Sequence, residues 1–149
     1  MLKRDTIQLL ALLSLTVAIP VHAEERLAVI VGTEREAKLS RQDVAQIFLR
    51  KRRFWSDGAS IVPVNRNAGS AARETFTKQI FAKEIRFLPS YWNRQYFQGV
   101  LPPLTLASDE AVRRFVAVEA DAIGYVHESF VDDSVRVILL LDAATPPSP

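Results

Sequence analysis

The chain has 149 residues, 48% of them hydrophobic and 24% charged, and it contains no cysteine. This composition is that of a folded globular protein and excludes a disordered chain, and the lack of cysteine excludes disulfides and thiol chemistry. The length suits one domain and excludes a multidomain enzyme.

The first 23 residues have the pattern of an export signal. A short basic start precedes the uncharged stretch 7–19, and Val21-His22-Ala23 supplies the small residues that a signal peptidase reads. The uncharged stretch is 13 residues long, shorter than the roughly 20 apolar residues of a membrane-spanning helix. We therefore predict a signal peptide over 1–23, cleavage after Ala23, and a soluble protein in a bacterial periplasm.

The charges of the mature chain are balanced. The leader contains Lys3, Arg4 and Asp5, so the 19 basic and 17 acidic residues of the whole chain fall to 17 and 16. Such a surface does not favour nucleic acid as a partner. The run 50–53 is the one dense basic cluster, and it fits either a solvated loop or a contact with an anionic partner.

Apolar periodicity, helix caps and turn residues predict strands alternating with helices. In chain order we expect a strand at 26–31, a helix at 41–49, a strand at 61–64, a helix ending near 82, a helix at 90–99, an extended segment at 104–107, a helix after Ser108, and strands at 122–126 and 135–141. This alternation predicts a single three-layer α/β domain with a mixed, mostly parallel sheet. The domain is expected to span 24–143 and to precede a disordered tail at 144–149.

Three of the predicted helices follow a serine that can cap the first turn, namely Ser40, Ser70 and Ser108. Large apolar side chains from different parts of the chain are expected in or beside the core: Trp55, Phe76, Phe115 and Ile123. Pro63 interrupts the second strand, which predicts an edge or a bend there.

The sequence offers no set of residues for catalysis. His127 is the one histidine after the leader, which argues against a histidine-based metal site and a Ser/His triad, and we expect it at the surface or at a strand end. Neither a GxGxxG motif nor a P-loop lysine is present, and Asp132-Asp133 falls in a predicted loop. We therefore expect no enzyme, no metal and no cofactor.

The loop between the second strand and the second helix is the strongest candidate for a binding site. The first N–H groups of a helix lack internal partners and lie at the positive end of its dipole, so they favour an anion. Gly69 allows close approach to the backbone, Ser70 offers a hydroxyl, and Arg66 or Arg73 can donate two hydrogen bonds to an oxyanion. The alternative is that Ser70 only caps the helix and both arginines are solvated.

An ordered set of short segments carries a resemblance to a known family. The segments are Leu39-Ser40-Arg41, Ile47-Phe48-Leu49, Trp55 with Asp57-Gly58, Ile61-Val62-Pro63-Val64-Asn65, Gly69-Ser70, Arg73-Glu74-Thr75-Phe76 and Ala122-Ile123-Gly124-Tyr125-Val126. In this order they resemble the periplasmic phosphate-binding proteins of ABC transporters, over residues 27–127. The resemblance covers one of the two lobes of that family and implies one lobe of a type II periplasmic binding protein.

The resemblance also implies a ligand and its site. In that family an Arg, a short gap and Gly-Ser-Gly-Thr hold phosphate, and these positions correspond here to Arg66, Gly69 and Ser70, followed by Ala71 and Ala72 in place of Gly and Thr. Their backbone N–H groups are expected to assist, with Arg73 as a substitute cation.

Three functions of different kinds remain. The first is an oxyanion-binding module with phosphate as its leading ligand, working alone or completed by a second copy. The second is an accessory or sensory domain that contacts a periplasmic or inner-membrane protein through the aromatic residues of 91–97 and the basic run 50–53. Phosphoester hydrolysis is a third reading, disfavoured because no base or metal site is visible.

Overall fold

A computed structural model describes residues 25–142, with only the backbone at positions 83 and 84. The predicted leader 1–23 and the predicted tail 144–149 lie outside these residues. The strands are β1 (Leu27–Gly32), β2 (Val62–Arg66), β3 (Leu104–Leu106), β4 (Ala122–His127) and β5 (Val135–Leu141). The α-helices are α1 (Arg41–Phe48), α2 (Ala71–Phe81), α3 (Leu88–Phe97) and α4 (Asp109–Val118), and the turns of 3-10 helix are Ala82–Phe87 and Glu128–Phe130.

The strands form one sheet in the order β3-β2-β4-β1-β5. Strand β2 pairs in parallel with β3 and β4, whereas β1 pairs antiparallel with both β4 and β5. All strands except β1 therefore run in one direction, which confirms the predicted mixed, mostly parallel sheet.

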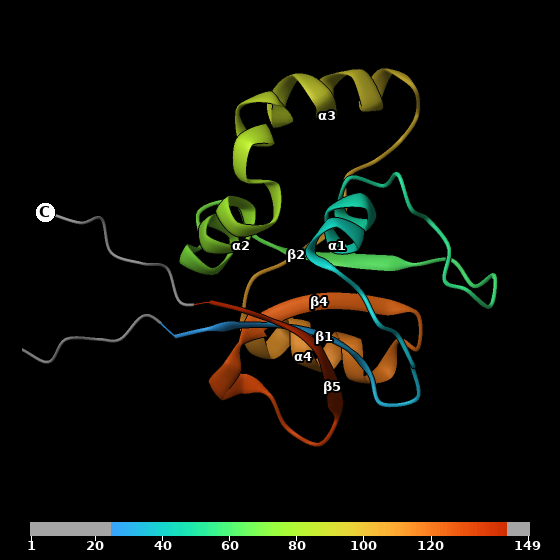
Figure 1. Cartoon of the computed structure of the whole chain (residues 1–149), viewed down its shortest axis with the longest axis vertical. Helices are drawn as coiled ribbons and strands as arrows, with labels where there is room; N and C mark the ends of the chain where they lie inside the picture. Colours follow the sequence, from blue (N-terminus) through green and yellow to red (C-terminus); the bar gives the residue numbers. More distant parts are fainter. Residues whose placement is uncertain (1–24, 143–149) are drawn as a thin grey trace, which may run out of the picture.

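Helices cover both faces of the sheet, so the predicted three layers are confirmed (Figure 1). Helices α1 and α2 pack on one face, where the side chains of Phe48, Phe76 and Tyr125 belong to one buried cluster. Helix α4 packs on the other face, where Val112 and Val116 belong to a second cluster. Helix α3 lies farther from the sheet, beyond α1 and α2, and contains no fully buried residue.

The sequence predicts most helix starts correctly because their caps are local. The hydroxyls of Ser40, Ser70 and Ser108 each accept a hydrogen bond from the backbone N–H three residues ahead. Helix α3 was expected to start near Ser90 but begins at Leu88, with a proline in its first turn, and the Ser90 hydroxyl donates to the Phe87 carbonyl instead. None of the helices within 25–142 is long and apolar enough to cross a membrane.

The predicted core residues lie where they were expected. Trp55, Phe76 and Ile123 are buried, and Phe115 is partly buried against the cluster beneath α4. Pro63 lies in an interior strand, but pairing of β2 with β3 starts only at the next residue, so the missing N–H costs no ladder bond on that side.

Candidate functional site

The candidate site lies at the edge of the sheet where β2, β3 and β4 end. Because these strands are parallel, their carboxyl ends meet at one edge, and ligands of open α/β sheets gather outside such an edge. The loop 67–70 leads from β2 into α2, and residues 107 and 108 lead from β3 into α4. Two helix N-termini therefore lie close to the strand ends that carry Arg66 and His127.

Ser70 caps helix α2, as one of the two sequence interpretations proposed. Its hydroxyl accepts a hydrogen bond from the Arg73 N–H at 3.1 Å and donates one to the loop carbonyl three residues earlier at 2.9 Å. The N–H groups of Ala71 and Ala72 make no hydrogen bond to another described residue. A Cβ at Gly69 would meet no atom within 4 Å, so the loop is open on that side.

Arg66 is buried and engaged by residues at the start of α4. Its Nη1 donates to Asp109 Oδ1 at 2.6 Å, and its Nη2 donates to the Ala107 carbonyl at 3.3 Å. Its Nε is buried without a partner among the described residues. Because Asp109 balances the guanidinium charge, any anion at Arg66 has to compete with this ion pair.

Asp109 also holds His127 at the end of β4. The second carboxylate oxygen of Asp109 lies 2.9 Å from His127 Nδ1, so a chain of polar contacts joins Arg66, Asp109 and His127. The strand-end position of His127 is confirmed, whereas the sequence analysis missed Asp109, because it lies 43 residues from Arg66 and 18 from His127. Among residues 25–142, no three acidic or histidine side chains gather where they could hold a metal ion.

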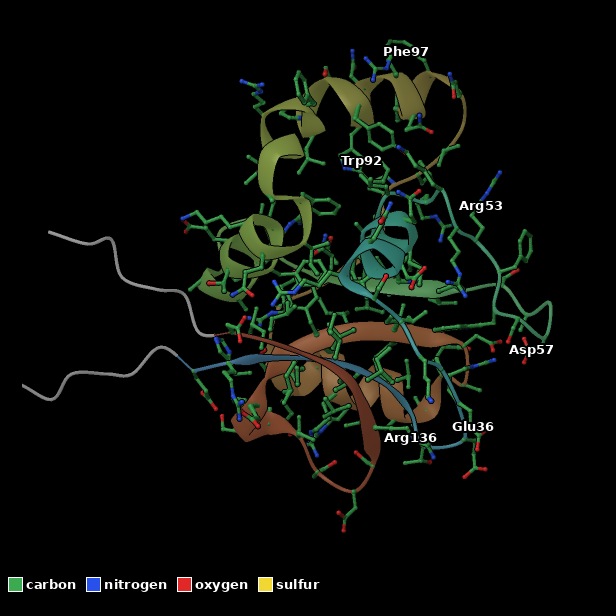
Figure 2. All side chains as sticks on the ribbon, viewed as in Figure 1. Glu36, Arg53, Asp57, Trp92, Phe97 and Arg136 are labelled. Carbon is green, nitrogen blue, oxygen red and sulfur yellow. The ribbon has the colours of Figure 1, made fainter. Side chains whose placement is uncertain are left out.

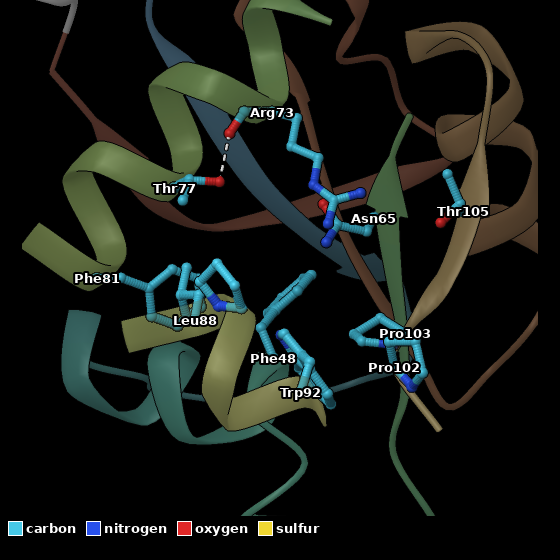
Figure 3. A pocket seen from close by; sticks show the side chains of 11 residues that line it. Phe48, Asn65, Arg73, Thr77, Phe81, Leu88, Trp92, Pro102, Pro103 and Thr105 are labelled. Carbon is cyan, nitrogen blue, oxygen red and sulfur yellow. Dashed lines mark hydrogen bonds between the residues drawn. The ribbon is translucent and has the colours of Figure 1, made fainter. Parts of the chain in front are cut away.

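Arg73 belongs to α2 on one face of the sheet, whereas the Arg66 guanidinium bonds to Asp109 of α4 on the other. Arg73 lines a cavity of about 430 Å³ (Figure 3). The lining residues are Phe48, Asn65, Arg73, Thr77, Phe81, Leu88, Pro89, Trp92, Pro102, Pro103 and Thr105. One Arg73 donor, Nη1, bonds to the Arg66 carbonyl at 2.9 Å. No carboxylate in the described part of the chain pairs with Arg73. Its positive charge therefore remains available to a ligand.

Asn65 presents a second donor to this cavity, and Tyr125 fixes its orientation. The Tyr125 hydroxyl donates to Asn65 Oδ1, which also accepts the Arg66 N–H at 3.0 Å. Because Asn65 Oδ1 accepts from these two donors, the Asn65 Nδ2 group points away from Tyr125 and from the Arg66 N–H. Asn65 Nδ2 has no hydrogen-bond partner among the described residues. Burial raises the pKa of Tyr125 to about 12, so the hydroxyl keeps its proton at neutral pH.

Helix α3 forms the apolar wall of the cavity. The Tyr91 hydroxyl donates to the Leu49 carbonyl at 2.6 Å, which ties α3 to the end of α1. The neighbouring Trp92 faces α1 and the cavity, whereas Phe97 points outward from the opposite side of α3 (Figure 2). The sequence analysis interpreted these aromatic residues as a contact surface and did not identify the wall, because nothing in the local pattern shows where α3 docks.

Comparisons with solved structures show which known fold this chain shares. No family model and no curated protein match the chain. A solved structure described as a phosphate ABC transporter substrate-binding protein with bound phosphate, from Clostridium perfringens, is 23% identical with a TM-score of 0.62, over 78% of this chain and 46% of that one. An ABC-type phosphate transport receptor from Vibrio cholerae is 19% identical with a TM-score of 0.58, over 78% and 47%. PstS from Borrelia burgdorferi is 15% identical with a TM-score of 0.60, over 74% and 43%.

These similarities show that the chain has the fold of part of a phosphate ABC transporter substrate-binding protein. The chain spans less than half the length of each of these three structures. This agrees with the resemblance over a single lobe.

Proposed function

We propose that this protein is a periplasmic oxyanion-binding module, with inorganic phosphate as its leading ligand, exported by the leader 1–23. One observation carries the proposal: Arg73, in the first turn of α2, is partly buried and has no carboxylate partner among the described residues. A cation, a helix N-terminus with free N–H groups and the carboxyl edge of parallel strands coincide there, and each favours an anion. The fold shared with phosphate-binding proteins supports the same ligand.

The proposed ligands are Arg66, Gly69, Ser70, Ala71, Ala72 and Arg73. The anion accepts hydrogen bonds from the two alanine N–H groups and from Arg73, and Gly69 leaves room for it. Ser70 adds its hydroxyl by exchanging its bond to the loop carbonyl. The Arg66 guanidinium lies on the other face of the sheet, so it contributes only when its ion pair with Asp109 opens and the side chain turns past the end of β2.

A second candidate function is that of an accessory or sensory domain that has the fold without the ligand. The exposed aromatic side chains of α3 favour it, since Tyr96 is 67% and Phe97 is 81% exposed. In that case the partner is a second copy or a periplasmic or inner-membrane protein.

The phosphate proposal is tested by calorimetric titration of the purified protein with phosphate, sulfate and neutral glycerol. We expect saturable binding of an oxyanion and at least tenfold weaker binding by Arg73→Gln, because a hydrogen bond to a charged group contributes about 1.5–3 kcal/mol and tenfold corresponds to about 1.4 kcal/mol. Ser70→Gly removes the hydroxyl at a cost of only a few tenths of a kcal/mol to the cap, so its effect on affinity reports the ligand role alone. Arg136→Gln, an exposed cation on β5, is the matched control.

Two results would decide against phosphate. One is a melting temperature that does not rise in millimolar phosphate or sulfate. The other is an equal loss of affinity in Arg73→Gln and Arg136→Gln, which would show only a general charge effect. Either result would leave the accessory domain as the better-supported function.

A further inference from the structure

The cavity beside Arg73 is much larger than an inorganic anion requires. Its volume of about 430 Å³ falls in the range of roughly 300–1,000 Å³ that is typical of sites for drug-sized organic ligands. Phosphate has five non-hydrogen atoms and would leave most of this space unfilled. Size therefore indicates a ligand with an organic part.

The cavity has a polar end and an apolar end. Figure 3 shows Arg73 and Asn65 together on one side, and Trp92, Leu88 and Phe81 across the space from them. Binding sites of this kind use a few polar groups to orient a ligand and apolar side chains to bury the rest of it. The arrangement suits a molecule that carries its charge at one end.

The polar end selects a negative charge. Among the described residues that line the cavity, Arg73 is the one that carries a charge, and none is an aspartate or a glutamate. After its bond to the Arg66 carbonyl, four of the five guanidinium N–H donors remain, and Asn65 Nδ2 lies on the same side. These donors suit the oxygens of a phosphate or carboxylate group.

The apolar end suits a flat ring. Trp92 is only partly buried and lines the cavity, and its helix is tied to the end of α1 because the adjacent Tyr91 hydroxyl donates to the Leu49 carbonyl. Aromatic rings pack well against such a face, in offset or edge-on geometry. A bare inorganic anion would make no use of this wall.

We propose that the cavity binds an organic oxyanion that carries an aromatic group, with the oxyanion at Arg73 and Asn65 and the ring against Trp92. This deepens the proposed oxyanion-binding function, on which it rests for the role of Arg73. The distinguishing feature is that the ring, and not only the charge, contributes to affinity.

The test compares phenyl phosphate, benzoate, inorganic phosphate and phenol by calorimetric titration of the purified protein. We expect phenyl phosphate or benzoate to bind at least tenfold more tightly than phosphate, and phenol to show no measurable binding. Trp92→Ala should reduce the ratio of phenyl phosphate to phosphate affinity to below about threefold, and Arg73→Gln should weaken binding of the aromatic anion at least tenfold. Phe97→Ala, on the outer side of the same helix, should leave the ratio unchanged.

The ligand series with the unaltered protein decides the inference even if a variant does not fold. Equal affinity for phosphate and both aromatic anions would overturn it and leave the phosphate proposal standing. Tight binding of an aromatic anion without binding of phosphate would support it and overturn phosphate as the leading ligand. Binding of none of the anions would overturn both.

Discussion

The hydroxyl of Tyr125 joins the buried core to the candidate site. It accepts the Arg66 N–H at 3.2 Å and donates to Asn65 Oδ1, and the ring stacks on Phe76 with the centroids 3.8 Å apart. Because burial raises the pKa of Tyr125 to about 12, the hydroxyl remains a donor throughout the physiological pH range. The orientation of Asn65 is therefore insensitive to pH until strongly alkaline conditions.

The raised pKa of Tyr125 predicts a loss of stability at high pH. Below pH 10 the tyrosine is neutral in both the folded and the unfolded state, so it adds no pH dependence. From about pH 10 to 12 the unfolded state loses the proton and the folded state keeps it, which should lower the free energy of unfolding by about 2–3 kcal/mol. Urea unfolding of the wild type and Tyr125→Phe at about pH 9 and about pH 11.5 measures this contribution.

Tyr96→Phe is the control for this experiment, because Tyr96 is 67% exposed. We expect Tyr125→Phe to lose less stability than the wild type over this range, and Tyr96→Phe to behave as the wild type. The same alkaline loss in all three proteins would contradict the assigned pKa.

At the scale of elements, helix α2 contributes side chains both to the buried core and to the candidate site. Its buried side chains, Ala72, Phe76 and Ile80, face the sheet, while Ser70 and Arg73 stand at its N-terminus. Phe76 packs between two other aromatic rings, with centroids 4.7 Å from Phe48 and 3.8 Å from Tyr125. This stack joins α1, α2 and β4, so it also fixes the position of the proposed ligands.

Phe76→Ala tests this packing. Removing a buried phenyl ring should lower the free energy of unfolding by about 3–5 kcal/mol, a large part of the 5–15 kcal/mol typical of a domain. Phe97→Ala removes the same group from a site that is 81% exposed, and we expect a change within about 0.5 kcal/mol. Chemical denaturation measures both, with Phe76→Leu as a milder variant in case Phe76→Ala does not fold. Similar losses in Phe76→Ala and Phe97→Ala would show that α2 does not pack on the sheet as described.

The elements that could be predicted from the sequence are those with local signals. The caps at Ser40, Ser70 and Ser108 and the apolar stripe of α4 depend on residues a few positions apart, so a linear pattern shows them. The 3-10 helix Ala82–Phe87 and the early start of α3 were missed, because Ser90 looks like a cap whose hydroxyl in fact bonds to a preceding carbonyl. Strand order was not predictable either, since pairing is settled by contacts between distant segments.

The candidate site also has parts that local sequence signals predict and parts that they do not. The free N–H groups, the cap at Ser70 and the place of Arg73 follow from the junction of a strand and a helix, which the sequence shows. The burial of Arg66 by Asp109 depends on α4 meeting the end of β2, and the wall at Trp92 depends on where α3 docks. Neither arrangement has a local signature.

At the scale of the whole molecule, the described residues form one sheet with a buried apolar cluster on each face. Strand β1, near the start of the described residues, is flanked by β4 and by β5, which lies at their end, so the two ends of the described part meet in the sheet. Leu141 of β5 belongs to the cluster beneath α1 and α2, and Val135 belongs to the cluster beneath α4. Although the chain spans less than half of the solved structures it resembles, its sheet is packed on both sides.

The pairing of β1 with β5 predicts which C-terminal truncations the protein tolerates. A chain that ends at Ser134 lacks β5, which uncovers the fully buried strand β1 as an apolar edge with unpaired N–H and C=O groups, so we expect aggregation or loss of cooperative unfolding. A chain that ends at Ala143 keeps all five strands and removes only the predicted tail, and we expect it to melt at the wild-type temperature.

Circular dichroism melts and size-exclusion chromatography compare the two truncated chains. Cooperative folding without β5 would refute the pairing of the chain ends, and a melting temperature that falls on removal of 144–149 would show that the domain extends beyond residue 143.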